Sequence, residues 1–382
     1  MKGTTTVKKI VYGGWGLAHH EGATLFLPCT AVGDKVEFSA AKKKKNCLFG
    51  HVERVIEPSP QRIEAECPVF GECGGCHLLH LSYEDELEVK KIALLENLER
   101  IGKVKIPITG VIMSPHRFGY RNHALFKVDE QGSAGFTMRE SRTIVPFPAE
   151  GCLLLPLEMR QAISRLPEAT LPRNGEVRTR MDSFGAVHFW GLDGISGPPD
   201  SLMKAGGFSF PVHPSAFFQV NRYLNDSLME LATSLPTRAR RRLLDCYCGV
   251  GFFTLALSKI VGEALGIERE RASFRNAQAA ARLNGISNVR FKCGRVEKEI
   301  GKARDVDMLV ADPPRSGLPG SAISGIIRLR PKEMIIVSCE PPTFARDTKR
   351  LIDAGYILNS IYLVDLFPGT YHTETVALFK RS

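Results

Sequence analysis

The chain lacks long hydrophobic runs. None of its apolar segments approaches the roughly 20 residues that cross a bilayer, and residues 1–5 carry no hydrophobic signal core. We therefore exclude a membrane-spanning protein and expect a cytosolic one. In that reducing compartment the ten cysteines are not expected to form a disulfide framework. Cysteines that stand in motifs are expected instead to bind a metal or to take part in catalysis.

The chain also has fewer acidic than basic residues. The 382 residues carry 51 Lys and Arg against 41 Asp and Glu, which gives a formal net charge of +10. Such a surplus indicates a polyanionic partner, of which nucleic acid is the commonest. The alternative is a basic protein without such a partner. The length allows two or three domains.

Residues 1–57 are expected to form a small β-domain. A glycine-rich turn at residues 12–16 precedes short apolar stretches at residues 25–28 and 35–38, which are typical of strands. The four-lysine run at residues 42–45 is either a solvated loop tip or a contact for phosphates.

Residues 58–205 are expected to form a central β-rich domain. Residues 124–128 and 134–138 flank a turn and predict a hairpin. Residues 83–100 predict an amphipathic helix, and the segment 81–101 is a candidate to dock on the catalytic domain. The apolar positions of this helix are Leu87, Ile92, Leu95 and Leu98.

Strand and helix patterns alternate in the last domain, residues 206–382. This alternation predicts an α/β fold with a doubly wound, Rossmann-like parallel sheet whose last strand is antiparallel. The expected strands are residues 242–248, 264–267, 289–292, 308–311, 334–337, 357–366 and 375–379.

A glycine loop, residues 245–251 (DCYCGVG), joins the first of these strands to a helix. Glycine lets the backbone approach a cofactor closely because it carries no Cβ. The loop lacks the third glycine of a dinucleotide fingerprint, which weakens the case for a nicotinamide site. Glu268, at the tip of the next strand, can accept both hydroxyls of a ribose, so the pair fits S-adenosylmethionine (SAM). A plain strand–helix turn is the alternative.

Two further strands end in reactive groups. Asp312 follows residues 308–311, and Cys339 comes just after residues 334–337. Open α/β sheets keep their chemistry at the carboxyl ends of their strands, so we expect this carboxylate and thiol at one edge. Pro313 and Pro314 lack N–H groups and make the exit beside Asp312 rigid. The arrangement favours nucleophilic catalysis.

In these motifs the sequence resembles the SAM-dependent RNA uridine-5-methyltransferase family. The resemblance covers nearly the whole chain in the right order, and its first 57 residues resemble the RNA-binding β-barrel called the TRAM domain. The matching motifs are residues 217–221 (FFQVN), 245–251, 312–315 (DPPR), 338–341 (SCEP) and 367–374 (FPGTYHTE).

The resemblance implies a reaction and the residues that perform it. Carbon 5 of uracil is too weak a nucleophile to take a methyl group from SAM directly, so a thiolate first adds to C6. The family's pattern makes Cys339 this nucleophile and Glu374 the base that removes the C5 proton. The residues that it implies for binding SAM or the uracil are Gln219, Tyr247, Gly249, Glu268 and Asp312.

A cysteine cluster precedes the predicted helix. Cys67, Cys73 and Cys76 have the spacing C-x5-C-x2-C, which by itself fits an iron–sulfur cluster and zinc about equally. The resemblance implies a [4Fe–4S] cluster with Cys152 as the remote fourth ligand, in a structural role. The remaining cysteines are expected to be structural, namely Cys29, Cys47, Cys246, Cys248 and Cys293. His77 and His80 are expected to be surface or packing residues.

The barrel and the cysteines resemble the subgroup that acts on large-subunit ribosomal RNA, and transfer RNA is the alternative substrate. We expect RNA as the partner, neither DNA nor a membrane, and a monomer. A non-catalytic RNA-binding or assembly factor and a nicotinamide oxidoreductase are more remote alternatives. Three positions depart from the family pattern: Glu340 and Phe252, where asparagine is known in the family, and Gly369, where histidine is frequent.

Overall fold

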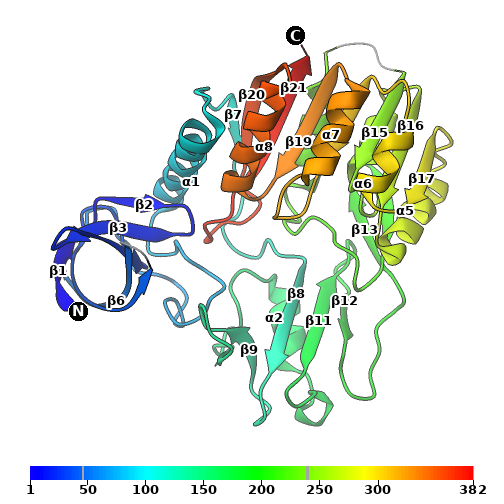
Figure 1. Ribbon diagram of the computed structural model, residues 1–382. Coiled ribbons are helices and arrows are strands. Elements are labelled where there is room, and N and C mark those ends of the chain that lie inside the picture. The colour runs from blue at the N-terminus through cyan, green and yellow to red at the C-terminus, as the bar shows by residue number, and fades with distance from the viewer. Residues whose placement is uncertain (45–46, 238–240, 382) are drawn as a thin grey trace.

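The computed structural model describes residues 1–44, 47–237 and 241–381. Figure 1 shows three parts: a ring of strands, a lower β-rich part, and a large sheet flanked by helices. The predicted role of the lysine run at residues 42–45 concerns side chains outside the described part. Among the described residues, no helix combines the length and the apolar character needed to cross a bilayer.

The N-terminal strands form one six-stranded sheet in the order β1-β5-β6-β4-β3-β2, and Figure 1 shows it curled into a ring. Val36, Phe38 and Ala40 of β5 point into this barrel while the residues between them face outward, as the two-residue period of a strand requires. The strands are β1 Lys2–Thr6, β2 Lys9–Val11, β3 Trp15–His20, β4 Ala23–Pro28, β5 Lys35–Lys44 and β6 Cys47–Glu57.

The middle of the chain forms a five-stranded antiparallel sheet in the order β10-β9-β8-β11-β12. The predicted hairpin is present, because Val128 of β8 pairs with Ala134 of β9. The elements are β8 His123–Val128, β9 Ala134–Thr137, β10 Ile144–Pro146, α2 Leu157–Ser164, the 3-10 helix Glu168–Thr170, β11 Glu176–Met181 and β12 Val187–Trp190.

A two-stranded hairpin, β13 Ser201–Ala205 with β14 Phe208–Val212, links this sheet to the catalytic part. Met203, Phe208 and Phe210 from the hairpin belong to the hydrophobic core of the catalytic sheet. The hairpin therefore packs as part of the catalytic unit, although the predicted boundary at residues 205/206 runs through it.

The catalytic sheet has eight strands in the order β17-β16-β15-β18-β19-β21-β20-β7. The predicted parallel sheet with an antiparallel last strand is confirmed, since β21 alone runs against its neighbours β19 and β20. The strands are β7 Gly110–Ile112, β15 Arg242–Cys246, β16 Glu263–Glu268, β17 Val289–Cys293, β18 Met308–Ala311, β19 Glu333–Ser338, β20 Tyr356–Val364 and β21 Glu374–Arg381.

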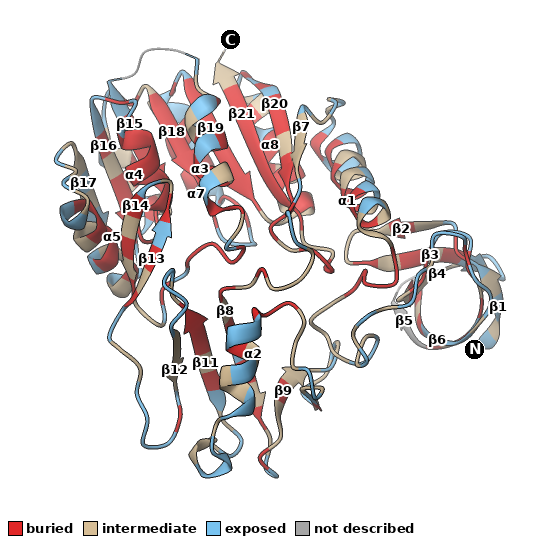
Figure 2. Ribbon diagram, turned by 180° about the vertical axis from the view of Figure 1, so that it is seen from behind, coloured by how far each residue is buried: buried red, intermediate tan, exposed pale blue. Residues whose placement is uncertain are grey.

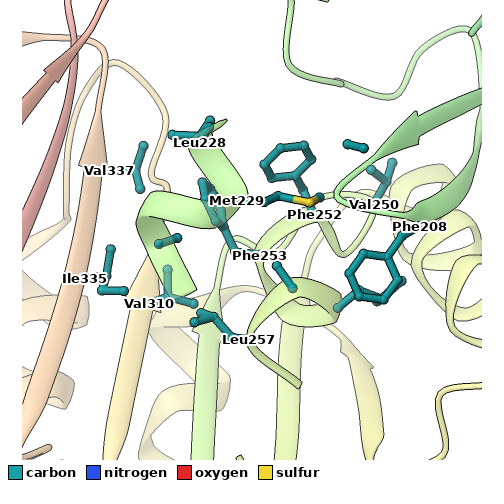
Figure 3. Packing of buried hydrophobic residues seen from close by; sticks show 14 of the residues in the cluster. Phe208, Leu228, Met229, Val250, Phe252, Phe253, Leu257, Val310, Ile335 and Val337 are labelled. Atoms are coloured by element: carbon teal, nitrogen blue, oxygen red, sulfur yellow. The ribbon is translucent and has the colours of Figure 1, made fainter. Parts of the chain in front are cut away.

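Helices cover both faces of this sheet, and every residue of β18 and β19 is buried (Figure 2). In Figure 3, Val310 and Val337 lie in one apolar cluster with Leu228, Met229 and Phe253. Burial on both faces explains why these strands read as continuous apolar runs. The helices are α3 Asn225–Ser234, α4 Phe252–Ser258, α5 Arg271–Leu283, α6 Val296–Glu299, the 3-10 helix Ile300–Lys302, α7 Gly320–Leu329 and α8 Pro341–Asp353.

The predicted helix near residue 90 is α1, Tyr83–Asn97, which continues as a π-helix over Leu98–Gly102. The Ser82 hydroxyl caps it by accepting the N–H of Asp85 at 3.1 Å. The predicted apolar face is wrong at Ile92, which is 48% exposed. The buried face carries instead a charged pair, Glu86 and Lys90.

That pair belongs to a buried ionic network between α1 and the catalytic sheet. The Lys90 Nζ donates at 2.7 Å to both Glu86 and Asp365, and at 3.2 Å to the carbonyl of Phe367. The Arg117 guanidinium donates to the other Glu86 oxygen at 3.1 Å. Opposite charges compensate one another here inside the protein, so the network fixes α1 against the loop that follows β20.

We predict that Lys90→Met strongly destabilises the protein. The substitution leaves Glu86 and Asp365 as uncompensated buried carboxylates, and breaking a buried network in this way costs about 3–5 kcal/mol. The neighbouring Lys91→Met is the matched control, because Lys91 pairs with Glu88 at the surface and such pairs contribute about 0–1 kcal/mol. Urea unfolding monitored by circular dichroism measures both, and equal losses would contradict the prediction.

Candidate active site

The residue order across β19 and β21 creates the reactive pair. Ser338 is paired with Thr375 in antiparallel register, so the next residues along each strand, Cys339 and Glu374, lie beside one another where the sheet ends. Asp312 follows directly after β18, whose Ala311 pairs with Ile336 of β19. Thiol and carboxylates thus meet at the carboxyl edge of the parallel strands, as predicted for open α/β sheets.

Burial raises the pKa of each of these three reactive groups. Burial, assisted by the charges of Glu374 and Asp312, raises the pKa of the Cys339 thiol to about 12, and Arg315 opposes that rise. Burial raises the pKa of Asp312 to about 7 against the hydrogen bond from Gln219 Nε2 at 3.3 Å. Burial and then Asp312 hold the pKa of Glu374 well above its ordinary range.

A cavity of about 400 Å³ opens next to this edge, within the usual range for a small-molecule site. All five residues predicted to bind the cofactor line it: Gln219, Tyr247, Gly249, Glu268 and Asp312. The cavity thus brings together residues that lie almost 100 positions apart in the sequence.

Backbone geometry shapes the floor of this cavity. Gly249 has φ +55° and a Cβ there would meet open space, so the glycine leaves room for a ligand. Its N–H donates to Glu268 Oε2 at 2.9 Å, and the N–H of Glu270 donates to Oε1 at 2.7 Å. Tyr247 also adopts a positive φ, +66°, a strained conformation for a side chain that such sites often carry.

Comparison with known proteins finds one matching family model and several relatives that align over nearly the whole chain. A family model described as tRNA (uracil-5-)-methyltransferase matches residues 205–382. An uncharacterized RNA methyltransferase of Aquifex aeolicus is 31% identical over 98% of this chain and 97% of its own. The 23S rRNA (uracil(1939)-C(5))-methyltransferase RlmD of Edwardsiella ictaluri is 30% identical over 97% and 93%.

The chain belongs to the RNA uracil-5-methyltransferase family. The predicted enzyme class, a SAM-dependent RNA (uracil-C5)-methyltransferase, is thereby confirmed. The fold agrees: the tRNA (uracil-54, C5)-methyltransferase of Pyrococcus abyssi, solved with S-adenosyl-L-homocysteine, superposes with a TM-score of 0.78 over 99% of this chain and all of that one, at 22% identity.

The family motif at residues 217–221 is held from outside the catalytic sheet. Asn122, at the start of the central sheet, donates from Nδ2 to the carbonyl of Gln219 at 2.8 Å and from its backbone N–H to Val220 at 3.0 Å. Asn221 Nδ2 donates to the Ser114 hydroxyl at 3.0 Å. The central part of this methyltransferase therefore positions Gln219 over the cavity.

Several residues of the cavity escaped sequence reasoning. Phe252 lines it with its ring, in keeping with the apolar side chain at that position. Cys248, expected to be purely structural, lines it as well. Glu297 accepts a hydrogen bond from the Tyr247 hydroxyl at 3.2 Å. It lies in the first turn of α6, four residues after the end of β17, and nothing in the sequence pairs it with a tyrosine 50 residues earlier.

The glycine that replaces a frequent histidine also has a structural reason. Gly369 has φ +79°, and a Cβ there would come within 2.8 Å of the Leu79 side chain. Its carbonyl accepts the N–H groups of His77 and Leu78, while its own N–H donates to Glu86 at 2.7 Å. The left-handed conformation and the close approach together favour glycine.

The four predicted metal-binding cysteines converge. Cys67, Cys73, Cys76 and Cys152 line one small apolar cavity together with Phe70, Phe136 and Phe147. Burial, then the neighbouring Cys152 and Cys73, raises the pKa of Cys76 well above its ordinary value. Within the described residues, no three Cys, His, Asp or Glu side chains are arranged around a single metal-ion position. His77 and His80 are buried packing residues.

We predict a pH-dependent stabilisation by Asp312→Asn. A carboxyl whose folded pKa is raised from 3.8 to about 7 stabilises the fold fully below the lower value and loses this contribution as pH rises through the upper one. The asparagine is neutral throughout. At about pH 8 the variant should melt higher by at least roughly 2–4 °C, the shift that about 1 kcal/mol produces in a domain of this size.

Thermal melts at about pH 5 and about pH 8 test this prediction, and the gap between variant and wild type should shrink at the lower value. Asp353→Asn is the control, because Asp353 pairs with Lys349 at the surface and should show no such dependence. A gap of the same size at both pH values would show that the Asp312 carboxyl is not the group that titrates.

Proposed function

We propose that this enzyme methylates C5 of a uridine in ribosomal RNA through a covalent adduct between Cys339 and C6 of the uracil. The observation that carries the proposal is the adjacency of Cys339, just after the end of β19, and Glu374, at the start of β21. The cavity lined by Gln219 and Asp312 begins next to this pair. Nucleophile, base and methyl-donor cavity therefore share one edge of the sheet.

The residues account for each step. Cys339 Sγ forms a bond to C6, and the C5–C6 π electrons move toward the O4 carbonyl. SAM, held in the cavity beside Glu268 and Gln219, supplies an electrophilic methyl group for the electron-rich C5. Glu374 then accepts the C5 proton, the C5–C6 double bond re-forms, and the Cys339 thiolate leaves. Atoms and electrons balance, with no net oxidation.

The protonation states of these side chains define how the reaction begins. The charge of Asp312 disfavours ionisation of the buried Glu374, so the two carboxyls share one proton near neutral pH, and when Asp312 holds it the Glu374 carboxylate can accept the C5 proton. Cys339 begins as a thiol and releases its proton to solvent before it attacks, with Arg315 favouring the thiolate. Water excluded by the bound uracil strengthens these interactions at the moment of reaction.

Ribosomal RNA is the substrate that we favour. Curated relatives that align over nearly the full chain, barrel included, are named as 23S rRNA methyltransferases. The net charge of +10 suits a polyanion, and the N-terminal ring of strands has the form expected of a TRAM-type RNA-binding barrel. Transfer RNA is the second candidate, favoured by the description of the matching family and by the Pyrococcus abyssi structure. We propose that the enzyme acts as a monomer.

The adduct gives the direct test. With RNA that contains 5-fluorouridine at the target, the C5 fluorine cannot be removed, so wild-type enzyme and SAM should form a stable protein–RNA adduct. Cys339→Ala should form none, and Glu374→Gln should accumulate an adduct with natural RNA and slow turnover by about 10²–10⁴-fold. Denaturing gels and tritium release from C5 measure both. An undiminished adduct with Cys339→Ala would overturn the nucleophile assignment.

We further propose that Cys67, Cys73, Cys76 and Cys152 hold a [4Fe–4S] cluster. In such a cluster each thiolate binds a different iron, so the sulfurs surround a volume, whereas one zinc ion draws its ligands to a single point. Four cysteines that line one shared cavity suit the first arrangement. The Gly75 N–H, which donates to Cys73 Sγ at 3.4 Å, would stabilise a bound thiolate.

The cluster would act as a structural brace. Cys76 precedes His77, whose N–H donates to the Gly369 carbonyl at 2.8 Å in the loop that leads to Glu374. We predict that protein purified without oxygen carries about four iron and four sulfide per chain, and that Cys76→Ala loses both and melts at a lower temperature. Cys293→Ala, remote from the cavity, is the control. One zinc per chain, or metal-free protein, would refute the assignment.

A further inference from the structure

A hydrogen bond ties the barrel to the residue beside the nucleophile. The Tyr12 hydroxyl, in the turn between β2 and β3, donates to Glu340 Oε1 at 2.5 Å. Glu340 directly follows Cys339 and precedes α8. The other Glu340 oxygen, Oε2, has no hydrogen-bond donor among the described residues. An acidic side chain in this place needs a reason, because an RNA substrate brings negative charge toward it.

Aromatic and cationic side chains surround this pair, and we call the set Tyr12, Glu340, His77, Tyr371, His372 and Arg315 the barrel-side rim. The Tyr371 ring lies edge-on to Tyr12 at 5.2 Å and to His77 at 4.6 Å, and 4.2 Å from His372. Arg315 contacts His372 Nε2 at 3.2 Å.

Two buried ring nitrogens in the rim lack a partner. They are Nδ1 of His77, a residue that is 7% exposed, and Nδ1 of His372, and neither has a hydrogen-bond partner among the described residues. Buried polar atoms without a partner are uncommon in a folded protein. Together with the free Glu340 oxygen, they indicate that the rim is built to meet a polar ligand.

The hydrogen-bonding atoms of the rim distinguish between the four RNA bases. The Tyr12 proton is committed to Glu340, so the two side chains offer only acceptor atoms to a ligand. Guanine presents two adjacent donors, N1–H and the 2-amino group, which match a carboxylate. Adenine and cytosine present one amino group beside an acceptor nitrogen, and uracil presents one N–H between two carbonyls that a carboxylate repels. Aromatic rings and arginine are the usual partners for unstacked bases in single-stranded RNA.

We propose that Tyr12 and Glu340 form a second base-binding site, which takes a guanine that neighbours the target uridine. The inference rests on the proposed function, because it takes the target uracil to lie at Cys339. In this proposal the barrel contributes Tyr12, one of the two side chains that recognise the base next to the modified uridine. Glu340 is a specificity-determining residue in this scheme.

Guanosine-to-inosine exchange tests the proposal, because inosine lacks only the 2-amino group. The target uridine is first mapped in total RNA from cells without this protein. Short synthetic RNAs that span it are then made, with each neighbouring guanosine replaced in turn. For wild-type enzyme one replacement should lower kcat/KM about tenfold, the effect of losing one part of a bidentate base contact.

The same replacement should have little effect on Glu340→Gln, which presents a donor where the carboxylate presents an acceptor, and a reduced effect on Tyr12→Phe. Glu99→Gln, at an exposed position, should keep the wild-type ratio. SAM binding checks that each variant is folded. The absence of a guanosine beside the target, an inosine effect at no position, or an unchanged ratio in Glu340→Gln would overturn the proposal. Failure of wild-type enzyme to methylate any RNA would instead refute the proposed function.

Discussion

The antiparallel pairing of β21 with β19 is the constraint on which the active site depends. It inserts the last strand of the chain between β19 and β20 and sets Ser338 opposite Thr375. A shift of one residue would turn the side chains of β21 to the other face of the sheet. Glu374 would then no longer face Cys339. The register is well determined, because β21 is buried along most of its length and each face packs against a different apolar cluster.

Burial at this edge of the sheet explains why the reactive groups hold their protons. Cys339, Asp312 and Glu374 share a site that disfavours negative charge, so each holds its proton more tightly than in water. In the proposed mechanism, such a site keeps the Cys339 thiol protonated until a uracil and a positively charged sulfonium are both present.

The three parts of the protein meet at one short loop, the segment between β20 and β21. The Lys90 network fixes its start, the cysteine segment pairs with Gly369 through His77 and Leu78, and the Tyr120 hydroxyl donates to the Pro368 carbonyl at 3.0 Å. The barrel reaches the same place through Tyr12, which touches Tyr371. All three parts therefore contact the loop that leads to Glu374.

The sequence by itself determined the parallel sheet, because buried strands such as β18 and β19 must be apolar throughout and glycine must stand where the chain turns at positive φ. It also located Cys339 and Asp312, since strand tips can be counted from strand patterns. It misjudged α1, where Ile92 faces solvent and Lys90 is buried, because pairing with Asp365, 275 residues away, overrides the apolar pattern.

Only the tertiary structure decided which distant residues meet. The Tyr247–Glu297 bond, the placement of β7 at the sheet edge and the contact of Tyr12 with Glu340 join segments with no shared local pattern. The physical reason is that periodicity reports whether a side chain is buried, whereas the identity of its partner depends on how complete elements pack. The sequence therefore indicated the chemistry of this enzyme, and the packing placed the barrel beside Cys339.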